Sequence, residues 1–354
     1  SRAHTPTLDS LANVGVRSTF RPCYPSVTFP NHYSMATGLH PDHHGLVNNF
    51  FYDAELDSSY RMGNLDPRFY GGEPIWNTAE RQGVRTASFY WVGSEVPLAS
   101  GQPSIWKPFD KSVSFSDRAD SVISWLKLPE DIRPHLIMWY MEEPDGVGHR
   151  ATPDSSATLS TVEHLDRILG DFFAEARRLD IFDQIDFIVL SDHGMATYYP
   201  ENYVNLNDYL PRDSFDYVFD GVPTLLYPKP TYTDSAYAIL KRVPRVTVWR
   251  KNEIPEKFVY GKNPRIGDLF VLPDIGTYLQ FRPESCPVFA ATHGYDNFAP
   301  EMEAIFYAAG PSFKQNVELP VMANVNLYLI IARLLDLQPA PNDGDSLVIS
   351  TLFR

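Results

Sequence analysis

The hydrophobic and polar positions of this chain change period along the sequence, which predicts strands and helices in alternation. Nearly unbroken apolar runs, typical of strands covered on both faces, include 134–141 (PHLIMWYM), 187–190 and 304–309. Further strands are predicted at 16–20 and 86–91. Apolar residues three and four positions apart predict helices near residues 5–15, 74–83, 117–126, 159–176 and 324–335.

This alternation predicts an α/β fold with a mostly parallel central sheet, flanked by helices and joined by right-handed crossovers. The chain has no repeat, low-complexity tract or composition break that would mark a linker, so we expect a single domain over 1–354. Residues 200–290 are less regular, with short strand candidates at 246–249 and 269–272. We interpret them as an excursion from the sheet.

Length and composition are those of a globular protein: 354 residues, 44% of them hydrophobic and 21% charged, can bury a substantial core. The net charge of −14 argues against a protein that wraps nucleic acid, so any phosphate site must be built locally, by metal. No apolar run approaches the roughly 18 residues of a membrane-spanning helix, and no leader opens the chain. A soluble, mature or truncated domain is expected. Whether Cys23 and Cys286 pair depends on the fold.

One hydroxyl stands at a predicted helix start. Pro30 favours the first turn of a helix and Gly38 can cap its end, so Thr28 lies at the helix N-terminus. Unpaired backbone N–H groups and the helix dipole favour an alkoxide or a phosphate oxygen there. Thr28 is a candidate nucleophile if something takes its proton; the alternative is an ordinary N-cap. The nearby His43 and His44 are predicted to be exposed turn residues.

Three polar clusters follow predicted strands or lie in loops able to reach the sheet edge where sites form in open α/β sheets. Asp145 and His149 are four residues apart, Asp192 and His193 are adjacent at a strand end, and His293 lies in a later loop. Each alone is most often a turn or surface residue. Together, two carboxylates and three imidazoles without thiolate suit zinc in a hydrolytic site and, with Thr28, are enough to hold two metal ions.

Several motifs in order give the chain a family resemblance over essentially its whole length. They are TFPNHY (28–33), TGLHPDHHG (37–45), GGEPIW (71–76), EEPDGVGH (142–149), SDHG (191–194), HGYDN (293–297) and PAPNDG (339–344). The sequence resembles the nucleotide pyrophosphatase/phosphodiesterase family of the alkaline phosphatase superfamily. The resemblance implies an alkaline phosphatase-like fold, two zinc ions and a threonine nucleophile.

The resemblance also implies roles for individual residues. One zinc ion would be held by Asp145, His149 and His293, and the other by Asp192, His193 and the Thr28 oxygen. Asn49 matches an asparagine that helps to hold a phosphate oxygen. Phe29 matches an aromatic residue that packs on the substrate base, and Phe109 falls where relatives often carry a tyrosine on the other side of the base; both phenylalanines could equally be core residues.

The chain departs from the family pattern at its start. Relatives begin with a central strand ending in an aspartate that binds the second zinc ion, whereas this sequence starts at Ser1, in what resembles the following connection. We therefore expect a sheet without its first central strand and a second zinc site that is weakened or empty.

The expected activity is zinc-dependent hydrolysis of phosphodiester or pyrophosphate bonds of nucleotides, through a phosphothreonine intermediate, with release of a nucleoside 5′-monophosphate. Alternatives are a phosphonate or choline-lipid phosphodiesterase of the same superfamily, or a metal-binding protein without turnover because the N-terminal aspartate is absent. Relatives are exported, so a periplasmic or otherwise extracytoplasmic location is expected. The sequence does not indicate an oligomeric state or a natural substrate.

Overall fold

A computed structural model describes residues 3–281 and 290–354 of the chain. Its main sheet has the strand order β17-β1-β16-β7, and a parallel three-stranded sheet has the order β5-β4-β6. The bounds are β1 Val16–Arg21, β4 Thr86–Phe89, β5 Ile105–Lys107, β6 Leu136–Trp139, β7 Phe187–Leu190, β16 Ala304–Ala309 and β17 Val317–Ala323. The strands predicted at 187–190 and 304–309 are confirmed with the same bounds.

Strand direction in the main sheet determines which loops meet. β1 is parallel to β17 and antiparallel to β16, and β16 is antiparallel to β7. β16 therefore runs against the other three strands of its sheet. As a consequence, the loop that enters β16 lies at the same edge as the loops that leave β1 and β7.

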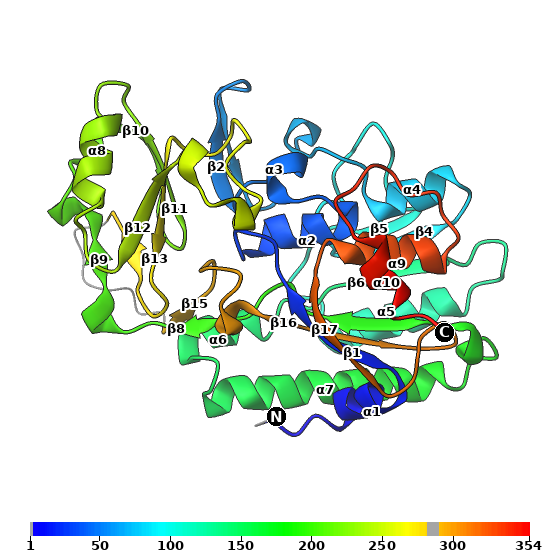
Figure 1. Ribbon diagram of the computed structural model, residues 1–354. Helices are drawn as coiled ribbons and strands as arrows, with labels where there is room; N and C mark the ends of the chain where they lie inside the picture. Colours follow the sequence, from blue (N-terminus) through cyan, green and yellow to red (C-terminus); the bar gives the residue numbers. More distant parts are fainter. Residues whose placement is uncertain (1–2, 282–289) are drawn as a thin grey trace.

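Helices cover the sheets, and the predicted helical segments are confirmed with small shifts at their ends. The helices are α1 Pro6–Val14, α2 Thr28–Thr37, α3 Pro41–His44, α4 Ile75–Arg81, α5 Phe115–Leu126, α6 Asp145–Ala151, α7 Ser156–Ala176, α8 Thr233–Leu240, α9 Asn326–Leu334 and α10 Ser346–Ser350. Figure 1 shows α1 and α7 below the main sheet, and α2, α4 and α9 above it. None of the helices in the described ranges is long and apolar enough to cross a bilayer.

β6 and β7 contribute to the same two hydrophobic clusters, one on each face. Ile137 of β6 and Val189 of β7 pack in the cluster that contains α7, whereas Leu136 and Ile188 pack in the cluster that contains α9. Both strands nevertheless stay largely half-buried, and each is bonded on one side only to a strand of the described chain. Because both faces are covered, we attribute this exposure to the open strand edges. The prediction about a first central strand is not tested by these contacts.

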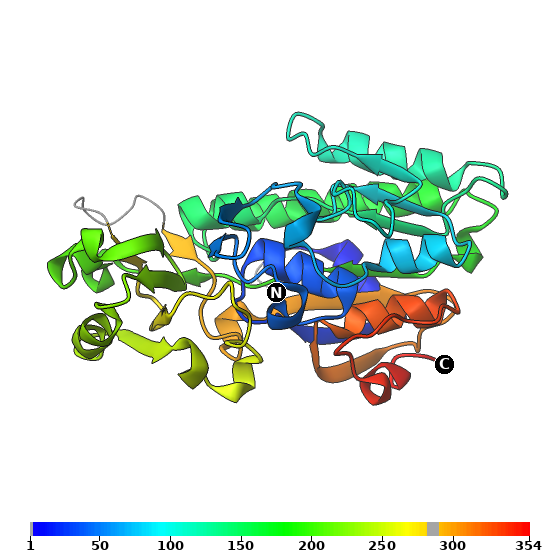
Figure 2. The same ribbon diagram turned by 90° about the horizontal axis from the view of Figure 1, so that it is seen from above.

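The segment after residue 200 is more regular than the sequence suggested. It forms a four-stranded antiparallel sheet of order β10-β11-β13-β12, with α8 packed on β12. Its strands are β10 Phe215–Phe219, β11 Thr224–Pro228, β12 Val246–Arg250 and β13 Leu269–Pro273, so the two strands predicted there are confirmed. Figures 1 and 2 show this sheet as a lobe at one side of the main sheet.

Three short strand pairs complete the fold. They are the hairpin of β2 Phe50–Asp53 and β3 Ser58–Arg61, the pair of β8 Ala196–Thr197 with β15 Ala291–Thr292, and the pair of β9 Val204–Asn205 with β14 Leu279–Gln280. Cys23 is buried, and its thiol lies 3.0 Å from the side-chain oxygen of Asn324. Cys286 lies outside the described residues, so the question of a disulfide stays open.

Candidate active site

The candidate residues reach one edge of the sheets from four different loops. Asp145 is the first residue of α6, after β6, and Asp192 follows β7. Thr28 is the first residue of α2, after β1. His293 precedes β16 and reaches the same edge because that strand runs antiparallel to its neighbours. The strand directions thus bring residues that are far apart in the sequence to the same edge of the sheets.

Asp145, His149 and His293 form a compact donor set, with one possible ligand atom from each lying within 4.8 Å of the others. The Oδ1 atom of Asp145 is 3.4 Å from His149 Nε2 and 3.5 Å from His293 Nε2. This oxygen is buried and has no hydrogen-bond partner among the described residues. An orphaned carboxylate oxygen beside two imidazole nitrogens fits a divalent cation, and the donor types suit zinc.

The second nitrogen of each candidate imidazole is anchored by the backbone. Nδ1 of His149 donates to the Ala291 carbonyl at 2.8 Å, and Nδ1 of His293 donates to the Ser26 carbonyl at 2.9 Å. Nδ1 of His193 donates to the Gly194 carbonyl at 2.9 Å. These bonds leave the lone pair of each Nε2 directed into the site, which is how metal-binding histidines are commonly oriented.

His293 and His149 have pKa values shifted in opposite directions. Burial, reinforced by the neighbouring His193, lowers the pKa of His293 to about 3 and keeps its ring neutral. Burial also acts to lower the pKa of His149, but the carboxylate of Asp145, 3.4 Å from Nε2, outweighs it and raises that pKa above 6.5. The pKa of Asp145 is lowered in turn, because its histidine neighbours outweigh its own burial. At neutral pH, His293 and Asp145 are thus in the forms that bind metal.

Asp192, His193 and Thr28 form the second group. The Thr28 hydroxyl lies 3.2 Å from His193 Nε2, and His193 Nε2 lies 3.2 Å from Asp192 Oδ2. Because His193 Nδ1 is a donor to Gly194, Nε2 accepts from the Thr28 hydroxyl. Burial raises the pKa of Asp192, but His193 and His32 outweigh it and hold that pKa below its ordinary value. The carboxylate is therefore ionised beside the hydroxyl.

The two groups are in direct contact. The rings of His193 and His293 stack with centroids 3.7 Å apart and planes inclined by 17°. Continuous short contacts therefore run from the Thr28 hydroxyl through His193 and His293 to Asp145 and His149. The five residues predicted to bind metal, together with Thr28, lie in one region of the structure.

Two glycines allow this close approach. Gly194 follows His193, and a Cβ there would collide with the Glu301 carbonyl; its N–H donates to the Met302 carbonyl at 2.9 Å. Gly294 follows His293 with a φ of +99°, and a Cβ there would collide with the Val222 carbonyl. The glycine after each histidine lets the two histidine loops pack closely against neighbouring backbone.

Of the residues predicted to contact substrate, Asn49 and Phe29 lie at the start of α2, and Phe109 lies beside Tyr90. The Asn49 side-chain oxygen accepts from the Phe29 N–H at 2.9 Å, which places the asparagine beside the start of α2. Phe29 is half-buried against a neighbouring hydrophobic cluster. Phe109 is 43% exposed, and its ring meets the edge of Tyr90 at 5.2 Å. Asn49 is thus fixed by the backbone of the residue after Thr28.

The structure corrects two expectations from the sequence, the exposure of His44 and the N-cap alternative for Thr28. His44 was expected at the surface but is buried, because its Nε2 hydrogen-bonds the Ser34 hydroxyl at 2.9 Å and its Nδ1 accepts from the Leu46 N–H at 3.1 Å. His43 is exposed, as expected. The N-cap alternative for Thr28 is wrong, because Val27 occupies the N-cap position and α2 starts at Thr28 itself.

One residue of the site was not singled out from the sequence. His32 is buried, and its Nε2 lies 3.5 Å from Asp192 Oδ2. The available signal was its spacing of four from Thr28, which places the two side chains on one face of a helix.

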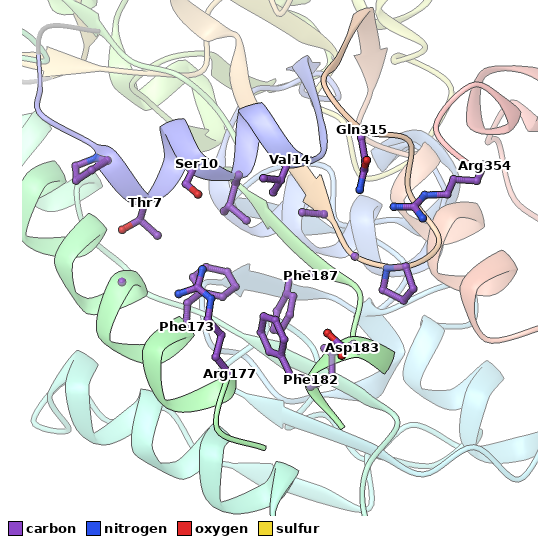
Figure 3. A pocket seen from close by; sticks show the side chains of 17 residues that line it. Thr7, Ser10, Val14, Phe173, Arg177, Phe182, Asp183, Phe187, Gln315 and Arg354 are labelled. Atoms are coloured by element: carbon purple, nitrogen blue, oxygen red, sulfur yellow. The ribbon is translucent and has the colours of Figure 1, made fainter. Parts of the chain in front are cut away.

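A cavity of about 510 Å³ lies elsewhere, between α1, α7 and the start of β7 (Figure 3). Its walls include Leu11, Phe173 and Phe187, with Arg177 and Asp183 also lining it. Asp192 and His193 follow the end of β7, so this cavity and the site lie at opposite ends of that strand. None of the candidate site residues lines the cavity.

Comparisons with known proteins agree with the motifs. The family model "Type I phosphodiesterase / nucleotide pyrophosphatase" matches residues 1–296. Bovine ectonucleotide pyrophosphatase/phosphodiesterase family member 3 is 32% identical over 96% of the chain, and a venom phosphodiesterase of Crotalus durissus collilineatus is 33% identical over 96%. The alignments cover 40% and 42% of those two relatives, so the chain spans about two fifths of their length.

Solved structures show the same likeness. Murine ectonucleotide pyrophosphatase/phosphodiesterase 5 superposes with a TM-score of 0.95 at 30% identity, covering 100% of this chain and 95% of that one. A threonine-to-alanine variant of that murine protein, described as inactive and in complex with AMP, matches equally well. The match confirms the predicted alkaline phosphatase-like α/β fold.

Proposed function

The chain belongs to the type I phosphodiesterase/nucleotide pyrophosphatase family, and from this premise we propose that it hydrolyses phosphodiester or pyrophosphate bonds of nucleotides with Thr28 as nucleophile. The observation that carries the proposal is the series of contacts that joins the Thr28 hydroxyl, through His193 and His293, to Asp145. An alcohol placed against two sets of metal-binding side chains is suited to nucleophilic catalysis.

Zinc is the metal that we propose. Asp145, His149 and His293 would hold one ion, and Asp192, His193 and the Thr28 oxygen the other. Bound there, the ions would lower the pKa of the hydroxyl and stabilise charge on the reacting phosphate. The second set offers one carboxylate, one imidazole and a hydroxyl, whereas the first offers one carboxylate and two imidazoles. We therefore expect weaker zinc affinity at the second set.

The chain's own residues account for the two steps. The deprotonated Thr28 oxygen attacks phosphorus in line with the leaving group; an O–P bond forms, the bond to the leaving group breaks, and the nucleotide is held on Thr28 through its phosphate. Water then attacks the same phosphorus, the bond between the Thr28 oxygen and phosphorus breaks, and a proton from the water restores the Thr28 hydroxyl as the nucleoside 5′-monophosphate departs. The side-chain amide of Asn49 and the N-terminus of α2 hold the non-bridging oxygens.

Substrate preference rests on the aromatic residues. We propose that Phe29 and Phe109 pack on the base, with stacking of roughly 1 to 3 kcal/mol per base. The murine relative solved with AMP supports a nucleotide ligand. We further infer an extracytoplasmic location, since the relatives are named as ectoenzymes and venom proteins.

The decisive experiment compares the wild-type chain with Thr28→Ala on an artificial nucleotide diester at several zinc concentrations. We expect turnover to fall to background in Thr28→Ala while the zinc ion of Asp145, His149 and His293 is retained. Retained turnover would remove Thr28 from the mechanism. No product from the wild-type chain at any zinc concentration would favour a metal-binding protein without turnover, and preferential cleavage of a choline ester or a phosphonate would favour those alternatives.

A further inference from the structure

His32 and Thr28 form a pair on one helix that faces two adjacent residues of another loop. Both lie on α2, four residues apart, so their side chains share a face of the helix. The Thr28 hydroxyl is 3.2 Å from His193 Nε2, and His32 Nε2 is 3.5 Å from Asp192 Oδ2. One helix face therefore contacts both members of the Asp192–His193 pair.

The ring of His32 is firmly held. Its side chain is 4% exposed and contacts the rings of Trp91 and Tyr140, with a ring-centroid distance of 4.8 Å to each. The Trp91 indole N–H also donates to the His32 carbonyl at 3.1 Å. The position of Nε2 relative to α2 is therefore fixed by packing.

An apolar residue would suit this pocket better if packing were the only requirement. The Nδ1 atom of His32 is buried and has no hydrogen-bond partner among the described residues. Leaving such an atom unpaired is unfavourable, and leucine or phenylalanine would avoid that cost. The contact that offsets this cost is the one between Nε2 and Asp192.

His32 is the imidazole that can donate to Asp192. The Oδ2 atom of Asp192 has two imidazole neighbours, His193 Nε2 at 3.2 Å and His32 Nε2 at 3.5 Å. His193 Nε2 carries the lone pair that would bind the metal ion, because Nδ1 holds the ring proton, so it does not donate to the carboxylate. His32 would remain as the imidazole that holds Asp192 Oδ2.

We propose that His32 is a positioning residue, whose Nε2–H donates to Asp192 and fixes this carboxylate relative to the Thr28 hydroxyl on the same helix face. The proposal rests on the proposed function, because it assigns to Asp192 the role of a ligand of the second metal ion. His32 itself touches neither metal nor substrate in this scheme; it acts through Asp192.

The test uses His32→Leu, which keeps apolar volume and removes the donor, and His32→Gln, whose side-chain amide nitrogen can reach the place of Nε2. His44→Gln is the matched control, since His44 is buried on α3 with its ring bonded to Ser34 and Leu46. Zinc affinity is measured by competition with a chelator, and kcat and KM on a nucleotide diester.

We expect His32→Leu to weaken the lower-affinity zinc ion and to reduce kcat by roughly 10- to 100-fold, with KM nearly unchanged, the usual effect of removing an outer-sphere partner. His32→Gln should recover most of both losses, and His44→Gln should change neither. Zinc affinity and kcat within twofold of wild type in His32→Leu would overturn the proposal. If His32→Leu does not fold, His32→Asn replaces it, because the shorter amide cannot reach Asp192; equal behaviour of the asparagine and glutamine variants would overturn the proposal.

A second measurement needs no zinc and no turnover. In the metal-free protein, the Nε2 proton of His32 should give a protected low-field NMR signal that disappears in Asp192→Ala. A signal that is absent from the wild-type protein, or that survives in the variant, contradicts the assigned contact. Activity that survives Thr28→Ala would instead defeat the proposed function and leave the contact between His32 and Asp192 standing.

Discussion

The imidazole rings of His193 and His293 stack face to face, with centroids 3.7 Å apart, although the residues come from loops separated by a hundred positions in the sequence. Two charged rings at this separation would repel one another strongly. Burial and His193 lower the pKa of His293 to about 3, so the stack is maintained with a neutral His293. At neutral pH the two donor sets are thus in contact through an uncharged His293.

This arrangement predicts how protons compete with zinc. Zinc binds neutral imidazole, and His149 is the ligand of its set whose pKa lies above the ordinary histidine value, because Asp145 outweighs its burial. As pH falls through this raised pKa, His149 gains a proton and zinc affinity falls. Calorimetry in buffers of different ionisation enthalpy should therefore detect more protons released per zinc ion at pH 6 than at pH 8. His149→Ala should bind zinc more weakly and lose this difference; a difference that persists would assign the proton elsewhere.

Asn49 offers a test of phosphate binding. Its side-chain oxygen is occupied by the Phe29 N–H, so its amide nitrogen is the group available to a phosphate oxygen. Asn49→Asp preserves the acceptor and removes the donor. We expect kcat to fall by roughly 10²- to 10³-fold, as when one oxyanion donor is lost.

A control variant separates this donor from the local fold. Asn48→Ala removes the acceptor of the Asn49 N–H but leaves the Asn49 side chain, and should cost activity much less. Equal losses in the two variants would mean that the loop conformation, rather than the amide donor, is what matters.

Phe109 is the more exposed of the two proposed base contacts. Phe109→Ala should raise KM for a nucleotide diester by roughly 5- to 150-fold, since stacking of about 1–3 kcal/mol is lost. KM for a diester without an aromatic group should not change, because that substrate has no ring to stack. An equal rise in KM for both substrates would show that Phe109 supports the site in another way.

The burial of His44 predicts how the stability of the folded protein depends on pH. Burial lowers its pKa from 6.5 to about 3, so below pH 6.5 the unfolded chain takes up a proton that the folded chain does not. Stability supplied by this group is complete above pH 6.5 and is lost as pH falls toward 3, by up to about 1.4 kcal/mol per pH unit. Denaturant unfolding of the metal-free protein should show a shallower acid loss in His44→Gln than in wild type. Parallel pH profiles for the two proteins would contradict this assignment.

The sequence was sufficient for most of the strands and helices because their apolar periods are local. Residue type and position near a strand also singled out the ligand candidates that the structure brings together, whose role as metal ligands stays a prediction. Asp145 and Asp192 could be proposed in this way, since each comes shortly after a nearly unbroken apolar run.

Properties that depend on long-range contacts were missed. His44 lies in a turn motif, and the motif does not reveal that Ser34 on the preceding helix binds its ring. The role of His32 depends on Asp192, 160 positions away in the chain. The antiparallel direction of β16 is likewise set by its register with β1 and β7, which its apolar pattern does not encode.

The central claim is that Thr28 carries the reacting phosphate. The most direct measurement is the mass of the peptide that contains Thr28, taken after acid quench of the zinc-loaded protein during turnover of a nucleotide diester. The account predicts that the nucleoside monophosphate is attached to Thr28, and that the adduct is absent without zinc and in Thr28→Ala. Multiple turnovers with no adduct on this peptide, or an adduct on another residue, would contradict it.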